Sequence, residues 1–154
     1  MADATEIVKS LNKKYKISFP VLIPNIKGTN SDSSLTIAYS LTGFENFYAA
    51  TEGRMKEIAI FTSASESFSQ KNTNCSVSES LERLRIVTKA ASDKNIRVRG
   101  YVSCIVKCPY DGQVDPDNVL KASKELLDMG CYEISLGDTI GAATPGKLIV
   151  KFLL

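Results

Sequence analysis

Hydrophobic and polar positions along this chain form short apolar runs that alternate with stretches of helical spacing. Two apolar runs, 57–65 (EIAIFTSAS) and 131–137 (CYEISLG), predict buried strands. A third strand is predicted at 97–106 (RVRGYVSCIV). A fourth is predicted at 16–24 (KISFPVLIP), where two prolines would make the pairing irregular.

Apolar residues spaced three or four positions apart predict helices between these strands. One helix starts at Ser76, where Ser76 and Glu79 have the spacing of a capping box. Another covers 114–130, with Asp115 as N-cap, a proline in its first turn and Gly130 as a stop signal. Helical patterns also occur at 3–13, 44–55 and 144–154.

The alternation of strands and helices predicts a parallel sheet with crossover helices. About four such strands could form an open sheet or part of a (β/α)₈ barrel, and a complete barrel needs roughly 250 residues. The chain has 154 residues. We expect one α/β domain over 1–154, in which 29–43 (TNSDSSLTIAYSLTG) is an insertion or loop because it fits neither period.

Composition fits one soluble domain and gives no case for nucleic acid or membrane binding. The hydrophobic content is 44% and the net charge is +2 with mixed signs. No apolar run approaches the roughly 20 residues of a membrane span. The N-terminus (MADATEIVKS) has no apolar region typical of a targeting signal.

Histidine is absent from the chain, which removes the commonest metal ligand and general base. Cys104 and Cys108 are four positions apart, but a zinc site would need a second ligand pair, such as Cys75 and Cys131. We expect reduced, buried thiols without disulfides instead.

The stretch CYEISLGDTIGAATPG (131–146) contains the main candidates for chemistry. Ser135, Asp138 and Thr139 leave a strand at its carboxyl end, where barrel enzymes place their active sites. Asp138 is also a common turn or cap residue, and the pattern alone leaves both interpretations open.

Two further residues have similar alternatives. Tyr101 is either a core residue of its strand or an exposed hydroxyl at the barrel mouth. Asn72 is placed in a loop before a helix, as a turn residue or a ligand contact.

Four long motifs closely resemble hydroxymethylglutaryl-CoA lyases: FPVLIPNIKG, SASESFSQKNTNCSVSES, VRGYVSCIVKCPYDG and MGCYEISLGDTIGAATPG. The resemblance runs from residue 1 to about 148, apart from 29–43. It implies part of a TIM barrel, family strands three to six. It also implies a carbon-carbon lyase that uses Mg²⁺ or Mn²⁺ to cleave an acyl-CoA, 3-hydroxy-3-methylglutaryl-CoA, to acetoacetate and acetyl-CoA in leucine degradation and ketogenesis.

Residue by residue, the resemblance makes Asp138 catalytic and assigns substrate binding to Asn72, Tyr101, Ser135 and Thr139. It assigns no metal ligand here, because the family's Arg-Asp pair, its His-x-His pair and its loop with the catalytic cysteine have no match in this sequence. Cys108 in KCPYDG lies after the wrong strand to be that cysteine.

We therefore expect a truncated lyase that is inactive alone. The alternatives are a non-catalytic module that associates with itself or with a full-length lyase, and a small complete enzyme based on Asp138, Tyr101 and cysteine. The family resemblance implies mitochondria, with the cytosol as the other compartment.

Overall fold

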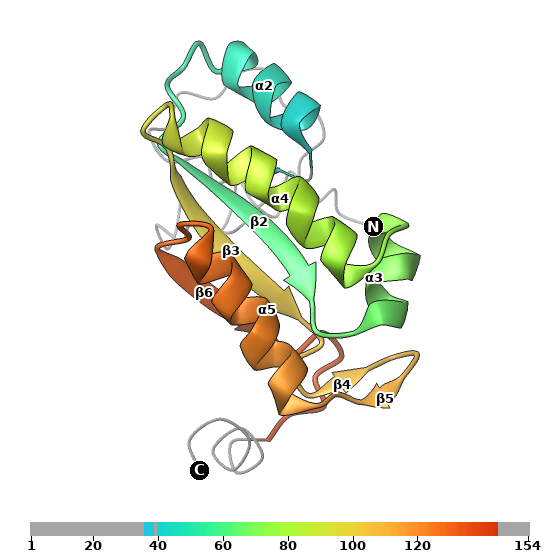
Figure 1. Cartoon of the computed structure of the whole chain (residues 1–154). Helices are drawn as coiled ribbons and strands as arrows, with labels where there is room; N and C mark the ends of the chain where they lie inside the picture. Colours follow the sequence, from blue (N-terminus) through green and yellow to red (C-terminus); the bar gives the residue numbers. More distant parts are fainter. Residues whose placement is uncertain (1–35, 39, 145–154) are drawn as a thin grey trace, which may run out of the picture.

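A four-stranded parallel sheet forms the centre of the computed structural model, which describes residues 36–38 and 40–144 (Figure 1). The strand order is β1-β2-β3-β6. The strands are β1 (Thr36–Ile37), β2 (Glu57–Ser63), β3 (Arg97–Ser103) and β6 (Glu133–Gly137). The predicted strands at 57–65, 97–106 and 131–137 are thus confirmed, each with shorter bounds.

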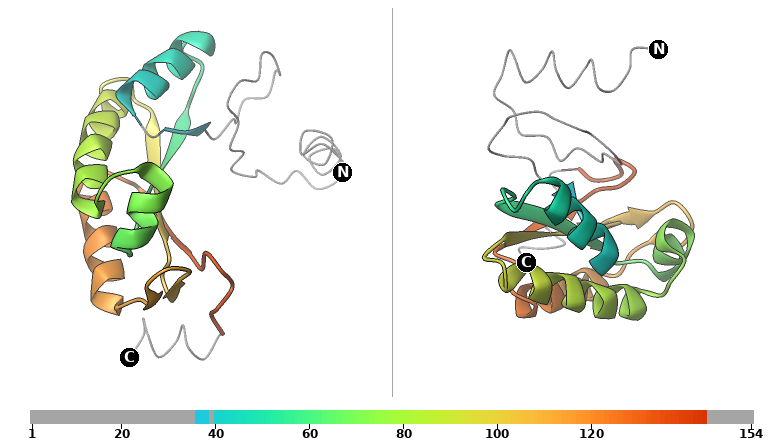
Figure 2. Two further views of the ribbon diagram at one scale, coloured as in Figure 1. Left: turned by 90° about the vertical axis from the view of Figure 1, so that its right-hand side faces the viewer. Right: turned by 90° about the horizontal axis from the view of Figure 1, so that it is seen from above.

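Helices connect these strands and cover one face of the sheet (Figure 2). They are α2 (Leu41–Ala50), α3 (Glu66–Thr73), α4 (Val77–Ser92) and α5 (Pro116–Asp128). A small antiparallel hairpin, β4 (Lys107–Cys108) with β5 (Gly112–Gln113), follows β3. No helix in the described part of the chain is long and apolar enough to cross a membrane.

The covered face of the sheet packs tightly against α5 at Gly100. A Cβ atom at Gly100 would lie 2.8 Å from Ile134 Cδ1 and 3.0 Å from Leu126 Cδ1. Gly100 and Ile134 are register partners on β3 and β6, so both point toward α5. Side chains alternate along a strand, and Tyr101 and Ser135 therefore point to the opposite face.

The predicted caps define the two longest helices. The side chain of Ser76 accepts a hydrogen bond from Glu79 N, and Glu79 in return accepts one from Ser76 N, which completes the capping box of α4. Asp115 accepts a hydrogen bond from Asp117 N at the start of α5.

Part of the segment 29–43 belongs to regular structure, which corrects the expectation of a loop there. Residues 36–37 pair with β2, and Ala38 is buried. Ser40 caps α2, so this helix begins at Leu41 rather than near Phe44. Residues 29–35 and 39 lie outside the described residues, as do the elements predicted at 3–13 and 16–24 and nearly all of that at 144–154.

The other differences occur at strand ends. Residues 64–75 were not predicted as a helix, yet α3 occupies most of them, because Ser65 accepts a hydrogen bond from Phe68 N and starts a helix there. β3 ends at Ser103, since Cys104 has a left-handed backbone with φ of 60°.

Candidate functional site

The carboxyl ends of β2, β3 and β6 lie side by side and form one edge of the sheet. The register pairs Ser63 with Ser103, and Ser103 with Gly137. The residues that follow each strand therefore meet at this edge, including the predicted Asp138 and Thr139.

Tyr101 and Ser135 lie next to each other, two register positions inside this edge. They are direct partners across β3 and β6. Both are half-buried, on the face of the sheet that the helices leave uncovered. The two side chains therefore share one face of the sheet, which is compatible with the exposed-hydroxyl alternative for Tyr101 and leaves its role a prediction.

Asp138 stabilises the turn that follows β6. Its Oδ1 accepts a hydrogen bond from Ala142 N at 3.1 Å, and its Oδ2 accepts one from Ala143 N at 2.7 Å. The turn role considered for Asp138 is thus present in the structure. A carboxylate has about four lone-pair positions, so two bonds leave capacity for another partner.

Thr139 joins the ends of two strands. Its Oγ1 accepts a hydrogen bond from the backbone N–H of Cys104 at 2.7 Å. This bond holds the loop after β6 against the strained turn after β3. Burial raises the pKa of the Cys104 thiol. The hydrogen bond between this thiol and the Thr139 side chain lowers the pKa, but by less than burial raises it.

Asn72 lies in α3 and not in a loop, which corrects its predicted setting. Its side chain is exposed and forms no hydrogen bond within the described residues. The structure thus brings Tyr101, Ser135, Asp138 and Thr139 together and shows no contact between Asn72 and these four.

A polar cluster at the same edge was not predicted, and it ties the β4–β5 hairpin to the start of α3. Ser65 Oγ donates to Asp111 Oδ2 at 2.6 Å and lies 3.0 Å from Cys108 Sγ. Asp111 also accepts a hydrogen bond from Ser67 N at 3.4 Å. The sequence analysis singled out Cys108 in KCPYDG but predicted no hairpin there, and no local pattern linked it to a serine 43 positions earlier.

These contacts shift the pKa of two groups in the cluster. Burial acts to raise the pKa of Cys108, but hydrogen bonds from Ser65 and from the backbone of Asp111 and Tyr110 outweigh it and lower the pKa. Hydrogen bonds from Ser65 and Ser67 lower the pKa of Asp111. The four cysteines are buried free thiols, so the expected burial is confirmed.

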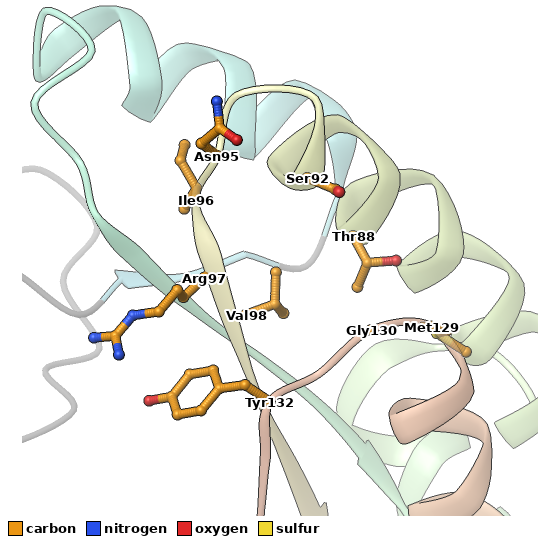
Figure 3. Close-up of a pocket in the computed structure, with 9 residues that line it drawn as sticks. All are labelled: Thr88, Ser92, Asn95, Ile96, Arg97, Val98, Met129, Gly130 and Tyr132. Atoms are coloured by element: carbon orange, nitrogen blue, oxygen red, sulfur yellow. The ribbon is translucent and has the colours of Figure 1, made fainter.

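A cavity of about 310 Å³ opens at the opposite end of the strands, between α4, α5 and the start of β3 (Figure 3). Thr88, Arg97 and Tyr132 are among its lining residues, and none of the five candidate residues is. Nearby, Arg99 donates to Glu57, to Glu133 and to the Tyr132 hydroxyl. Such networks at the amino-terminal end of barrel strands belong to stability rather than to catalysis.

The described residues do not fit a metal centre. Among them, no group of three or more histidine, cysteine, aspartate or glutamate side chains is placed to hold an ion.

Known proteins are similar to this chain in sequence and in fold. The HMGL-like family model matches residues 25–152. The chain is 47% identical over 154 residues to the mitochondrial hydroxymethylglutaryl-CoA lyase of Macaca fascicularis, and 46% identical over 148 residues to the cytoplasmic 3-hydroxy-3-methylglutaryl-CoA lyase of Danio rerio. It covers 41% of the first protein and 39% of the second.

The fold of this chain is also similar to the folds of solved hydroxymethylglutaryl-CoA lyases. The crystal structure of hydroxymethylglutaryl-CoA lyase from Pseudomonas aeruginosa matches 82% of this chain with a TM-score of 0.72 and 49% identity. The match covers 41% of that chain. These solved relatives are TIM barrels, so the predicted partial barrel is confirmed.

Proposed function

Because this chain belongs to the HMGL-like family, we propose that it forms part of the barrel of a hydroxymethylglutaryl-CoA lyase. This enzyme cleaves 3-hydroxy-3-methylglutaryl-CoA to acetoacetate and acetyl-CoA, a reaction of leucine degradation and ketone-body formation. One observation carries the proposal. Four predicted residues gather where two neighbouring parallel strands, β3 and β6, end at one edge of the sheet.

Asp138 is the proposed catalytic residue. Its carboxylate would either hold a catalytic arginine or take part in proton transfer, with the turn bonds to Ala142 and Ala143 fixing its direction. The family's arginine has no match in this sequence, so it would come from other residues of the barrel.

The remaining candidates are proposed to bind the acyl-CoA substrate. Tyr101 and Ser135, which are partners across β3 and β6, would hydrogen-bond its oxygens through their hydroxyl groups. Thr139 would contact the substrate at the end of β6 while it holds the turn after β3. Asn72 is assigned on the family motif alone.

The family is a metal-dependent lyase family, and we propose Mg²⁺ or Mn²⁺ as its cation. The described side chains of this chain do not form its ligand set. We therefore assign the ligands to other parts of the barrel and derive no step through the ion.

The second candidate is a non-catalytic module that pairs with a lyase chain or with itself. The chain has no histidine, which favours this candidate because the family uses a histidine pair. For either function we propose a mitochondrial location, since the macaque relative is named mitochondrial, and the cytosol is the alternative, since the zebrafish relative is named cytoplasmic. Cell fractionation distinguishes the two.

A graft tests the proposal. Residues of this chain replace the matching segment of the Pseudomonas aeruginosa lyase, and acetoacetate release is measured. Asp138→Asn in the graft should lower kcat by about 10²- to 10⁴-fold, the usual range for losing an acid–base group. Asp128→Asn, an exposed acid in α5, is the matched control and should leave kcat unchanged. An active graft that tolerates Asp138→Asn would remove Asp138 from the site.

A further inference from the structure

Phe61 of β2 lies in the same row of side chains as two of the candidate residues, on the face of the sheet that the helices leave uncovered. The register pairs Phe61 with Tyr101, and Tyr101 with Ser135. Each of these three residues stands two positions before the last residue of its strand. Phe61 therefore lies at the same depth below the carboxyl-end edge as Tyr101 and Ser135.

The other rows on this face of β2, β3 and β6 have a different character. They hold small and charged residues on either side of the Phe61 row: Ser63, Ser103 and Gly137 toward the edge, and Ala59, Arg99 and Glu133 away from it. The deepest row is the pair Glu57 and Arg97. Among these described strand residues, Phe61 is thus the only large side chain without a polar atom.

The acyl group of the proposed substrate combines polar groups with one apolar branch. In 3-hydroxy-3-methylglutaryl-CoA, the carboxylate, the hydroxyl on C3 and the thioester carbonyl need polar partners, whereas the methyl group on C3 does not. Removing a methyl group from water is favourable where it meets an apolar surface. In the row that contains Tyr101 and Ser135, the ring of Phe61 offers that surface.

The branch on C3 also differs between acyl-CoA substrates named for a similar protein. A Pseudomonas aeruginosa protein that is 44% identical to this chain over 146 residues is named 3-hydroxy-3-isohexenylglutaryl-CoA/hydroxy-methylglutaryl-CoA lyase. The two substrates in that name differ in the branch, which is an isohexenyl chain in one and a methyl group in the other. Apolar sites discriminate by size, and one methylene group changes kcat/KM by about 10- to 200-fold.

We propose that Phe61 contacts the branch on C3 of the acyl group and restricts the site to a methyl branch. Its ring supplies the apolar contact for the methyl group and fills the space into which a longer branch would extend. Phe61 thus determines specificity and takes no part in proton transfer. This inference rests on the proposed function, because it assumes a lyase site at the ends of β3 and β6.

The test uses the graft of this chain in the Pseudomonas aeruginosa hydroxymethylglutaryl-CoA lyase and measures kcat/KM for the methyl and the isohexenyl substrate. Phe61→Ala should raise the ratio of isohexenyl to methyl kcat/KM by about tenfold or more, because the excluding ring is gone. Phe61→Leu keeps a smaller apolar side chain and should shift the ratio in the same direction by less. Ile86→Ala, an apolar truncation on α4 at a residue that is 56% exposed, is the control and should leave the ratio unchanged.

An unchanged ratio in both Phe61 variants would overturn the proposal, as would an equal shift in Ile86→Ala or a wild-type graft that prefers the isohexenyl substrate. Far-UV circular dichroism verifies folding. If Phe61→Ala does not fold, Phe61→Leu decides, and failure of both to fold would make Phe61 a framework residue and overturn the proposal. An active graft that depends on Asp138 but keeps its ratio in both variants would sink only the role of Phe61, whereas an inactive wild-type graft would sink the lyase function and this role with it.

Discussion

At the scale of single residues, the contact of Thr139 with the backbone of Cys104 has the clearest consequence. It spans two strand ends, from the loop after β6 to the turn after β3. Cys104 has a left-handed backbone there, so the loop needs outside support.

Thr139→Val removes the acceptor and leaves the Cys104 N–H without its partner. We expect the free energy of unfolding to fall by about 1–3 kcal/mol. Urea denaturation followed by circular dichroism measures this change. Thr139→Ser keeps the hydroxyl and should retain most of the stability; equal losses in both variants would show that the hydroxyl is not what matters.

Asp111 makes the hairpin sensitive to acid. Hydrogen bonds from Ser65 and Ser67 lower its pKa in the folded chain below the unfolded value of about 3.9. Its contribution is therefore fully present above that pH and is lost as the pH falls through the folded pKa.

Asp111→Asn removes this titration. Urea midpoints measured from pH 6 down to pH 3 should fall less steeply below about pH 4 in the variant than in the wild type. Parallel curves for the two proteins would mean that Asp111 is not held by these bonds in solution.

At the scale of elements, the capping box of α4 is a sequence signal that the structure reproduces. Ser76→Ala should lower the free energy of unfolding by about 1 kcal/mol, because an N-cap bond is lost. Ser78→Ala, in the first turn of the same helix and exposed, should stay within about 0.5 kcal/mol of wild type. Chemical denaturation measures the free energy of unfolding of both variants. If Ser78→Ala lost as much as Ser76→Ala, the loss could not be assigned to the N-cap hydrogen bond.

The contact of β3, β6 and α5 at Gly100 permits a second test at this scale. Gly100→Ala would place a methyl group against Ile134 and Leu126, so we expect a loss of about 1–3 kcal/mol from overpacking. Adding Ile134→Val removes the nearest atom and should recover part of this loss. A double-mutant cycle by urea denaturation measures the coupling, and strictly additive effects would contradict the packing.

These elements also show how far sequence reasoning reaches. The strands around Ile60, Val102 and Ser135 were predicted from apolar runs, and α4 and α5 from their caps, because these signals are local. The helix that contains Asn72 was missed, since its serine-rich sequence has little apolar periodicity. The Ser65–Asp111 contact joins residues 46 positions apart, and no local pattern encodes such a pair.

The candidate site was likewise only partly predictable from the sequence. Its carboxyl-end location followed from the alternation of strands and helices, and family motifs gave its residue types. The bonds from Asp138 to its own turn and from Thr139 to the Cys104 backbone depend on loop geometry, which a strand–helix pattern does not specify.

At the scale of the whole molecule, our central claim is that this chain provides one wall of a lyase site and not all of it. The proposed wall consists of the ends of β3 and β6 with Tyr101, Ser135, Asp138 and Thr139. The sequence contains no histidine, and no group of three or more cysteine, aspartate or glutamate side chains in the described part of the chain is placed to hold a metal ion. Catalytic groups that act as a unit lose most of their effect on kcat when one of them is missing. We therefore expect no turnover from a chain that supplies only this part of the site.

Acetoacetate formation from 3-hydroxy-3-methylglutaryl-CoA tests this claim most directly, measured in one coupled assay on the 154-residue chain and on the graft, each with Mg²⁺ or Mn²⁺. We predict metal-dependent turnover by the graft and none above background by the chain. Metal-dependent turnover by the chain alone that disappears with Asp138→Ala would contradict the claim, because the chain would then contain a complete site.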